Sequence, residues 1–247
     1  MYRQGRGDPL VLVHGIGSRW QVWRPILDRV AERREVIAFD LPGSGGGSVS
    51  DLADQVASFL DRLGLRRPAI AGSSLGGGIA LELGRRGLAG AVVAFAPVGF
   101  FSAGQARWCR TVVGLARAGA TRLDPVLPAL MSTRAGRRAL CGVFYARTGH
   151  LSPADCVAEA RALAAAPGFA AARAALGDWR LERSAVLDRL PVTVAWGTRD
   201  LVLPHIGQAA RARAVLPHAR HVRLRGCGHL PFADDPASCA GLLLRPY

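Results

Sequence analysis

The chain has 247 residues, a formal net charge of +14, and a composition that is 50% hydrophobic and 20% charged. This length suits one large α/β domain, or a domain with a sizeable insertion, and the apolar content excludes a disordered chain. No run of about 18 apolar residues is free of charge, which excludes a membrane-spanning helix.

The positive charge comes from arginine alone, because lysine and asparagine are absent from the sequence. This pattern is typical of a GC-rich genome, so it gives little support to nucleic-acid binding. The arginines form no long run, and no aromatic–basic RNA motif is present. We therefore expect no nucleic-acid partner, but a weak, salt-dependent attraction to anionic partners.

Five cysteines, an odd number, occur without a Cys-x-x-Cys pair. Neither a disulfide framework nor a cysteine zinc site is expected, and a reducing cytoplasm fits this pattern. The first residues show no secretory signal, so we expect a cytoplasmic protein without a membrane partner.

Short apolar runs along the chain predict buried strands at 10–13, 36–39, 69–71, 91–95, 191–196 and 221–224. Because these runs do not alternate with polar residues, the sheet is expected to be mostly parallel and covered on both faces. Helical patterns lie between the runs, at 52–63, 79–83, 204–216 and 236–244. Asp235-Pro236 is a predicted helix start. The alternation predicts a doubly wound α/β sheet.

Residues 99–185 contain no convincing strand and are rich in Ala, Arg and Leu. They predict a helical insertion, with a helix start at Ser152-Pro153, into a core made of 1–98 and 186–247. The aromatic residues of the insertion form either its own small core or part of a substrate pocket. Our predicted pocket residues are Gly15, Phe100, Phe101, Trp108, Phe144, Tyr145, Val202 and Leu230.

The strongest chemical motif is Gly72-Ser73-Ser74-Leu75-Gly76, between a predicted strand and a predicted helix. A tight strand–turn–helix connection of this kind exposes a nucleophilic serine, and it needs small residues two positions before and after it. Ser74 is the predicted nucleophile; the alternative is a serine that only caps the helix.

Two further loops complete the predicted chemistry. His14-Gly15-Ile16-Gly17 follows the first predicted strand, and the N–H groups of Ile16 and Leu75 are expected to bind an oxyanion; His14 itself is expected to be structural. Asp200 and His229 each follow a later strand, so both can converge on Ser74 as orienting acid and general base. The other histidines lack metal-ligand spacing, and no metal site is expected.

These motifs, together with Leu10–Gly15 and Asp40–Gly45, resemble those of the α/β-hydrolase superfamily. The resemblance implies the α/β-hydrolase fold, a helical cap in place of residues 99–185, and Ser74, Asp200 and His229 as the catalytic residues without a cofactor. Members usually carry more strands ahead of the His-Gly motif, so a trimmed front edge of the sheet is expected here. A serine in the elbow argues against dehalogenases and epoxide hydrolases, which use aspartate.

We therefore expect a serine hydrolase that acts on a carboxylic ester or a related small acyl compound. Eight arginines and one acid lie between Phe100 and Ala154. This surplus is either a solvated surface or a docking site for an acidic carrier protein, which would indicate a thioesterase or cyclase. Hydrolysis of a carbon–carbon bond suits the same three residues. A small-molecule binding protein that has little or no turnover is the alternative outside enzymes.

Overall fold

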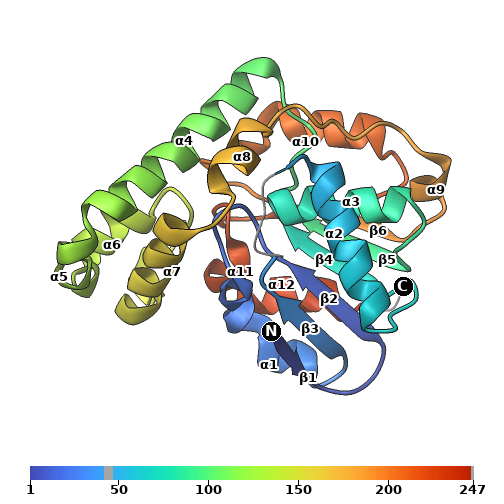
Figure 1. Cartoon of the computed structure of the whole chain (residues 1–247), viewed down its shortest axis with the longest axis horizontal. Coiled ribbons are helices and arrows are strands. Elements are labelled where there is room, and N and C mark those ends of the chain that lie inside the picture. Colours follow the sequence, from blue (N-terminus) through green and yellow to red (C-terminus); the bar gives the residue numbers. More distant parts are fainter. Residues whose placement is uncertain (42–46, 246–247) are drawn as a thin grey trace.

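The computed structural model describes residues 1–41 and 47–245. The motif at Asp40–Gly45 lies partly outside the described residues, and so does the glycine-rich stretch Gly43–Gly47, for which the sequence predicts a turn. The expected α/β-hydrolase fold is confirmed: a mostly parallel sheet carries helices on both faces, and a second helical layer lies beyond one end of it (Figure 1).

The sheet has seven strands in the order β1-β3-β2-β4-β5-β6-β7. They are β1 (Tyr2–Gln4), β2 (Pro9–Val13), β3 (Glu35–Phe39), β4 (Ala69–Ser73), β5 (Ala91–Phe95), β6 (Val192–Gly197) and β7 (Arg220–Leu224). Of the described strand pairs, only β1 with β3 is antiparallel. The six predicted strands are therefore present, and β2 to β7 run parallel.

One strand was not predicted from the sequence. Tyr2–Gln4 pairs antiparallel with β3, with Arg3 opposite Ile37, and adds an edge ahead of the first predicted strand. Arg3 and Gln4 are exposed and Tyr2 is half-buried, so no apolar run marks the strand. A short polar strand, β1, thus forms the front edge of the sheet.

Side chains of β2 alternate between two cores. Leu10 and Leu12 belong to one core, with Ile26 of α1 (Arg24–Ala31) and Leu242 of α12 (Pro236–Leu243). Val11 and Val13 belong to the other, with side chains of α2 (Val49–Arg62) and α3 (Leu75–Arg85). Burial on both faces explains the continuous apolar runs that identified the strands.

Four helices of the core correspond to the predicted patterns: α2 (Val49–Arg62), α3 (Leu75–Arg85), α10 (His205–Val215) and α12 (Pro236–Leu243). Three others were not predicted from the sequence: α1 (Arg24–Ala31), α9 (Ala185–Asp188) and α11 (Pro231–Asp234). The predicted cap of α12 is present: the side chain of Asp235 accepts a hydrogen bond from the N–H of Ser238 at 3.0 Å. A short 3-10 turn, η1 (Trp20–Trp23), precedes α1.

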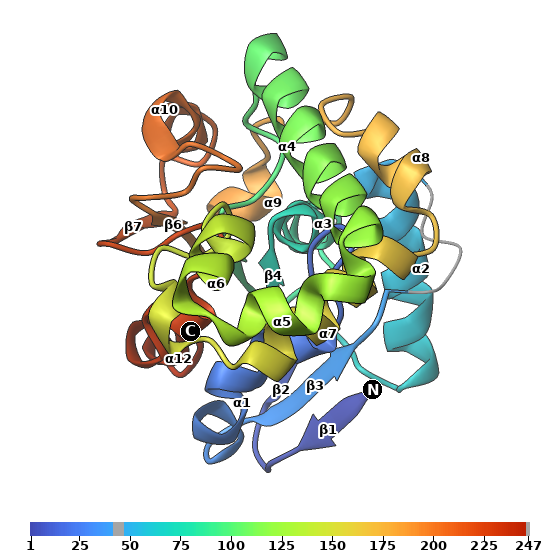
Figure 2. The same cartoon turned by 90° about the vertical axis from the view of Figure 1, so that its left-hand side faces the viewer.

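Residues 96–191, all described, contain helices and turns but no strand. Apart from α9, these helices are α4 (Ala103–Arg122), α5 (Leu127–Ser132), α6 (Arg134–Cys141), α7 (Pro153–Ala165) and α8 (Phe169–Ala174), with 3-10 turns η2 (Asp124–Val126) and η3 (Thr148–His150). Helices α4 to α7 form a layer in front of the sheet (Figure 2). We call the segment from α4 to α8 the helical insertion. Ser152 caps α7 through the N–H of Asp155, as predicted.

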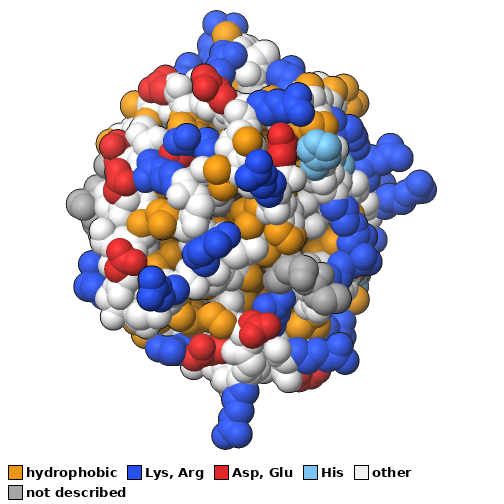
Figure 3. Space-filling model, turned by 90° about the vertical axis from the view of Figure 1, so that its right-hand side faces the viewer, with side chains coloured by type: hydrophobic (Ala, Val, Ile, Leu, Met, Phe, Trp, Pro, Cys, Tyr) orange, Lys and Arg blue, Asp and Glu red, His pale blue; other side chains and the backbone are white. Residues whose placement is uncertain are grey.

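Basic side chains lie around much of the face shown in Figure 3, with acidic and apolar side chains between them. No single continuous basic surface is visible there. Among the described residues, no helix is long and apolar enough to cross a membrane.

Candidate active site

Ser74 lies in the sharp turn between β4 and α3. Its backbone has φ 56° and ψ −116°, a conformation that residues other than glycine rarely adopt. A Cβ atom at Gly72 would overlap the carbonyl oxygen of Gly76, and one at Gly76 would overlap the carbonyl oxygen of Val13. Only glycine at these two positions lets the strand turn directly into the helix.

The hydroxyl of Ser74 does not cap α3, although the residue occupies the N-cap position. The backbone N–H of Ser74 donates to the carbonyl of Phe95 at 2.8 Å, which fixes the turn against β5. The side chain lines a cavity between the sheet and the helical insertion. The turn therefore presents a hydroxyl to the cavity at the positive end of a helix.

His229 and Asp200 form a buried pair on the loops that follow β7 and β6. His229 Nδ1 lies 2.8 Å from Asp200 Oδ2, and both side chains are nearly or fully inaccessible to solvent. The other carboxylate oxygen of Asp200 accepts the N–H groups of Val202 at 2.9 Å and Leu203 at 2.7 Å. Because a carboxylate only accepts, Nδ1 carries the proton, and Nε2 is left as the basic nitrogen of the neutral ring. His229 lines the same cavity as Ser74.

The loops that carry the pair are packed against each other. The N–H of Arg199 donates to the carbonyl of Cys227 at 2.9 Å, and the N–H of Gly226 donates to Thr198 Oγ1 at 2.9 Å. A Cβ atom at Gly197 would overlap the carbonyl oxygen of Gly228. This close approach packs the loop that carries Asp200 against the loop that carries His229, beyond the carboxyl ends of β6 and β7.

The loop after β2 lies directly against the elbow. A Cβ atom built on Gly15 would stand 3.1 Å from Cβ of Ser74, and Ile16 lines the cavity. Leu75 is the first residue of α3, so its N–H has no acceptor within the helix. Both predicted oxyanion donors therefore come from segments that border the serine.

His14 connects this loop to the end of β3. The N–H of Leu41 donates to His14 Nε2 at 2.9 Å, so the proton sits on Nδ1, which donates to the carbonyl of Gly15 at 2.8 Å. Burial lowers the pKa of His14, which keeps the ring neutral. These bonds agree with the structural role expected for His14.

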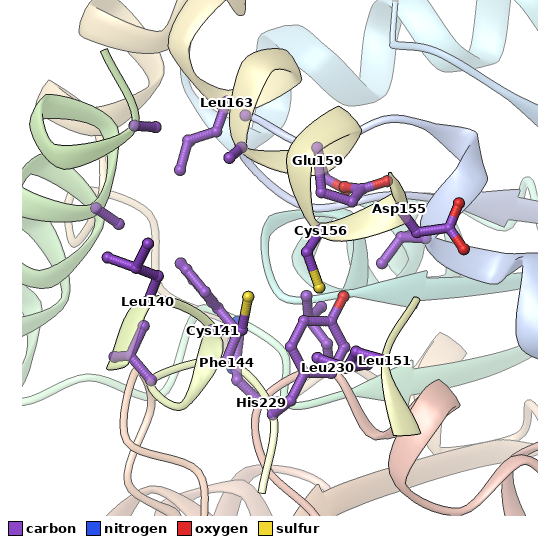
Figure 4. Close-up of a pocket in the computed structure, with 18 of the residues that line it drawn as sticks. Leu140, Cys141, Phe144, Leu151, Asp155, Cys156, Glu159, Leu163, His229 and Leu230 are labelled. Carbon is purple, nitrogen blue, oxygen red and sulfur yellow. The ribbon is translucent and has the colours of Figure 1, made fainter. Parts of the chain in front are cut away.

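The cavity has a volume of about 940 Å³ and is lined mainly by apolar side chains. This volume is near the upper end of ordinary ligand pockets. Besides Ser74, Ile16 and His229, the predicted residues that line it are Gly15, Trp108, Phe144, Tyr145 and Leu230. Figure 4 shows Phe144, His229 and Leu230 along one side of this space.

Three predicted pocket residues lie elsewhere. Phe100, Phe101 and Val202 are 2%, 3% and 0% exposed and belong to the main core; none lines the cavity. The ring of Phe100 stands edge-on to Trp196, with centroids 6.5 Å apart. Their placement in the pocket was wrong, because an apolar side chain in a sequence does not reveal whether it fills a core or borders a cavity.

Asp234 is a site residue that the sequence analysis missed. Its buried carboxylate accepts three backbone N–H groups: Gly228 at 2.7 Å, Ala146 at 3.0 Å and Arg147 at 2.7 Å. In addition, the N–H of Leu230 donates to the carbonyl of Phe144 at 2.9 Å. One side chain thus joins the loop that carries His229 to the helical insertion. The only sequence signal was an acid placed one position before the helix cap.

The described residues include no group of three or more His, Cys, Asp or Glu side chains that could hold a metal ion. The five cysteines are buried and free. Cys227, beside the histidine loop, is fully buried in an apolar core, and burial raises the pKa of its thiol to about 11. These thiols are packing groups in the resting protein.

Comparison with known proteins adds an independent line of evidence. Residues 10–242 match the alpha/beta hydrolase family. An uncharacterized protein of Mycobacterium tuberculosis is 32% identical over 261 residues, covering 94% of this chain and 73% of that protein. A membrane phospholipase A described as a bacterial virulence factor is 25% identical, with a TM-score of 0.74 over 97% of this chain and 79% of that one. An esterase from Thermogutta terrifontis is 22% identical, with a TM-score of 0.71 over 98% and 90%, and this likeness shows the fold alone.

Proposed function

Because the chain belongs to the alpha/beta hydrolase family, we propose that it is a serine hydrolase that cleaves a carboxylic ester. The observation that carries the proposal is the pair of His229 and Asp200 at 2.8 Å, with His229 and Ser74 lining one cavity. A serine hydroxyl needs such a neighbouring imidazole, held in one tautomer by a carboxylate, to become a nucleophile.

In this mechanism Ser74 Oγ attacks the ester carbonyl while its proton passes to His229 Nε2. The negative oxygen of the tetrahedral intermediate is bound by the N–H groups of Ile16 and Leu75. When the intermediate collapses, the imidazolium gives the proton to the departing alcohol, and the acyl group stays on Ser74. Water then attacks the acyl group while His229 Nε2 takes its proton. The imidazolium returns this proton to Ser74 Oγ as the bond to the acyl group breaks and the acid is released. No other group is needed to balance the reaction.

Asp200 contributes by orientation and charge. Two backbone N–H groups hold its second oxygen, so the carboxylate cannot rotate away from His229. It stabilises the imidazolium that forms during the attack and remains ionised. Replacement by Asn would leave the geometry intact but favour the wrong tautomer of the ring.

The test is labelling by a fluorophosphonate probe and hydrolysis of a panel of activated esters by the wild type, Ser74→Ala and Ser73→Ala. Ser73 Oγ is buried without a hydrogen-bond partner among the described residues and does not line the cavity, so Ser73→Ala is the matched control. We expect Ser74→Ala to lose labelling and at least 10³-fold in kcat/KM, and Ser73→Ala to keep both.

Near wild-type hydrolysis by Ser74→Ala would refute the mechanism. A folded wild type that binds apolar ligands, but neither labels nor hydrolyses any ester, would instead identify a binding protein on this fold.

A further inference from the structure

The two ends of the cavity differ in polarity. Arg19, Arg24, Asp155 and Glu159 line one end, near η1 and the start of α7. Helices α4, α5 and α6 line the other end with uncharged side chains. Figure 4 shows the separation: Leu140 and Leu163 lie on one side of the space, and Asp155 and Glu159 on the other. We call the uncharged end the apolar arm.

The apolar arm is free of charge although two of the helices that line it are rich in arginine. Helices α4 and α6 together carry seven arginines. Residues 103–141 are all described, and none of these arginines lines the cavity. The inward face of α4 instead presents side chains such as Val112, Ala116 and Ala120. An arginine-rich segment therefore keeps one face free of charge where it borders the cavity.

The arm is long and is bordered by buried side chains. Cavity-lining residues of α4 run from Trp108 to Ala120, which corresponds to about 18 Å along the helix axis at 1.5 Å per residue. Leu127 and Met131 of α5, which follows α4 in the chain, and Cys141 of α6 also line the cavity and are buried in a separate apolar core. A ligand in the arm would contact these three side chains.

Resting on the proposed function, we infer that the apolar arm holds a long, unbranched acyl chain of the ester. The acyl part stays attached to Ser74 after the first step, so an apolar arm of the same cavity suits it. The alcohol must leave before water attacks, and the end lined by the exposed Arg24 and Asp155 gives it a polar route out. Each methylene buried in the arm is expected to raise kcat/KM by roughly threefold to fourfold.

Two glycines of α4 provide a matched pair of variants. A Cβ atom at Gly119 meets nothing within 4 Å, and Gly119 lines the cavity. A Cβ atom at Gly104 also meets nothing within 4 Å, but Gly104 is exposed and does not line the cavity. Gly119→Phe therefore places a ring in the arm, whereas Gly104→Phe places it in solvent.

The experiment compares p-nitrophenyl acetate, octanoate and decanoate, which share one leaving group, with the wild type and both variants. For the wild type we expect kcat/KM to rise roughly hundredfold or more from acetate to octanoate. Gly119→Phe should lower the decanoate value at least tenfold more than the acetate value, whereas Gly104→Phe should keep both. Ser74→Ala, which cannot turn over, should bind a fluorescent fatty acid, and Gly119→Phe in that background should abolish the binding.

The outcomes separate this inference from the proposed function. Acetate hydrolysis that depends on Ser74 but does not increase with acyl length overturns the acyl arm and leaves the hydrolase intact. The same holds if Gly119→Phe lowers acetate and decanoate hydrolysis equally. Hydrolysis that survives Ser74→Ala overturns the proposed function itself.

Discussion

The carboxylate of Asp234 accepts a hydrogen bond from the backbone N–H of Gly228, with 2.7 Å between Oδ2 and N. Gly228 directly precedes His229, and the same carboxylate also accepts the N–H groups of Ala146 and Arg147 in the helical insertion. This carboxylate therefore links the residue before the histidine to the helical insertion over the cavity.

Asp234→Ala is expected to lower kcat by about 10²-fold, because three N–H groups lose their acceptor and the histidine loop is no longer fixed over the cavity. Asp234→Asn, whose amide oxygen can accept some of these bonds, should lose less. The measurement is kcat per active site, with the sites counted by fluorophosphonate titration, so that a smaller folded fraction does not enter the result.

The neighbouring Asp235→Asn is the control, because the carboxylate of Asp235 caps α12 and, within the part of the chain that the structure describes, accepts no hydrogen bond from the histidine loop. It should change stability and leave kcat per site unchanged. A kcat per site for Asp234→Ala equal to that of Asp235→Asn would show that Asp234 does not position His229.

Ser74→Gly should make the protein more stable while it removes the nucleophile. The φ of 56° at Ser74 is strained for a residue with a Cβ atom, and glycine relieves this strain. After the entropic cost of glycine, a net gain of about 1 kcal/mol in the free energy of unfolding is expected. Urea denaturation of Ser74→Gly and Ser74→Ala checks this; Ser74→Ala retains the Cβ atom and should not show the gain. The strain argument fails if Ser74→Gly is the less stable of the two.

Gly76→Ala should destabilise the protein by about 2–3 kcal/mol, because its Cβ atom would overlap the carbonyl oxygens of Val13 and His14. Gly241→Ala makes the same chemical change in α12, where the position is exposed and a Cβ atom meets nothing within 4 Å. That variant should gain about 0.5–1 kcal/mol from helix propensity. Equal effects of the two changes on the unfolding midpoint would contradict the close packing of the elbow.

Glu159 should make the protein less stable as pH rises. Burial raises the pKa of this carboxyl from about 4.5 to about 7, an effect that the nearby Arg19 opposes and Asp155 increases. The folded protein therefore binds more protons than the unfolded chain between these two values, and stability falls as pH increases through that window. Glu159→Gln should remove up to about 3 kcal/mol of this dependence.

Thermal unfolding between about pH 4.5 and pH 8 measures the effect, with the exposed Glu32→Gln as the control. The expected result is that Glu159→Gln is more stable than the wild type at the alkaline end and similar to it at the acidic end. If stability depends on pH in the same way in the wild type and Glu159→Gln, the pKa of Glu159 is not raised in the folded protein.

Much of this fold could be predicted from the sequence because its strands and its tight turn depend on local sequence patterns. The runs of β2 and β5 are apolar throughout since both faces of the sheet are covered, and Gly72 and Gly76 are required by a turn only five residues long. Asp200 and His229 were found because parallel strands bring their carboxyl ends to one edge of the sheet. By contrast, Tyr2–Gln4 was missed because an exposed edge strand has no apolar pattern.

The sequence by itself determined which residues carry reactive groups and in which order along the chain they occur. Only the tertiary structure decided which side chains share a space. Phe100 and Phe144 are the same residue type, and both lie in the insertion predicted at 99–185, yet one is in the core and the other borders the cavity. Asp234 and Asp235 are adjacent, yet one accepts bonds from a segment more than 80 residues away while the other caps its own helix. The physical reason is that a side chain's hydrophobicity and charge are fixed by its chemistry, whereas its partners are fixed by how distant segments pack around it.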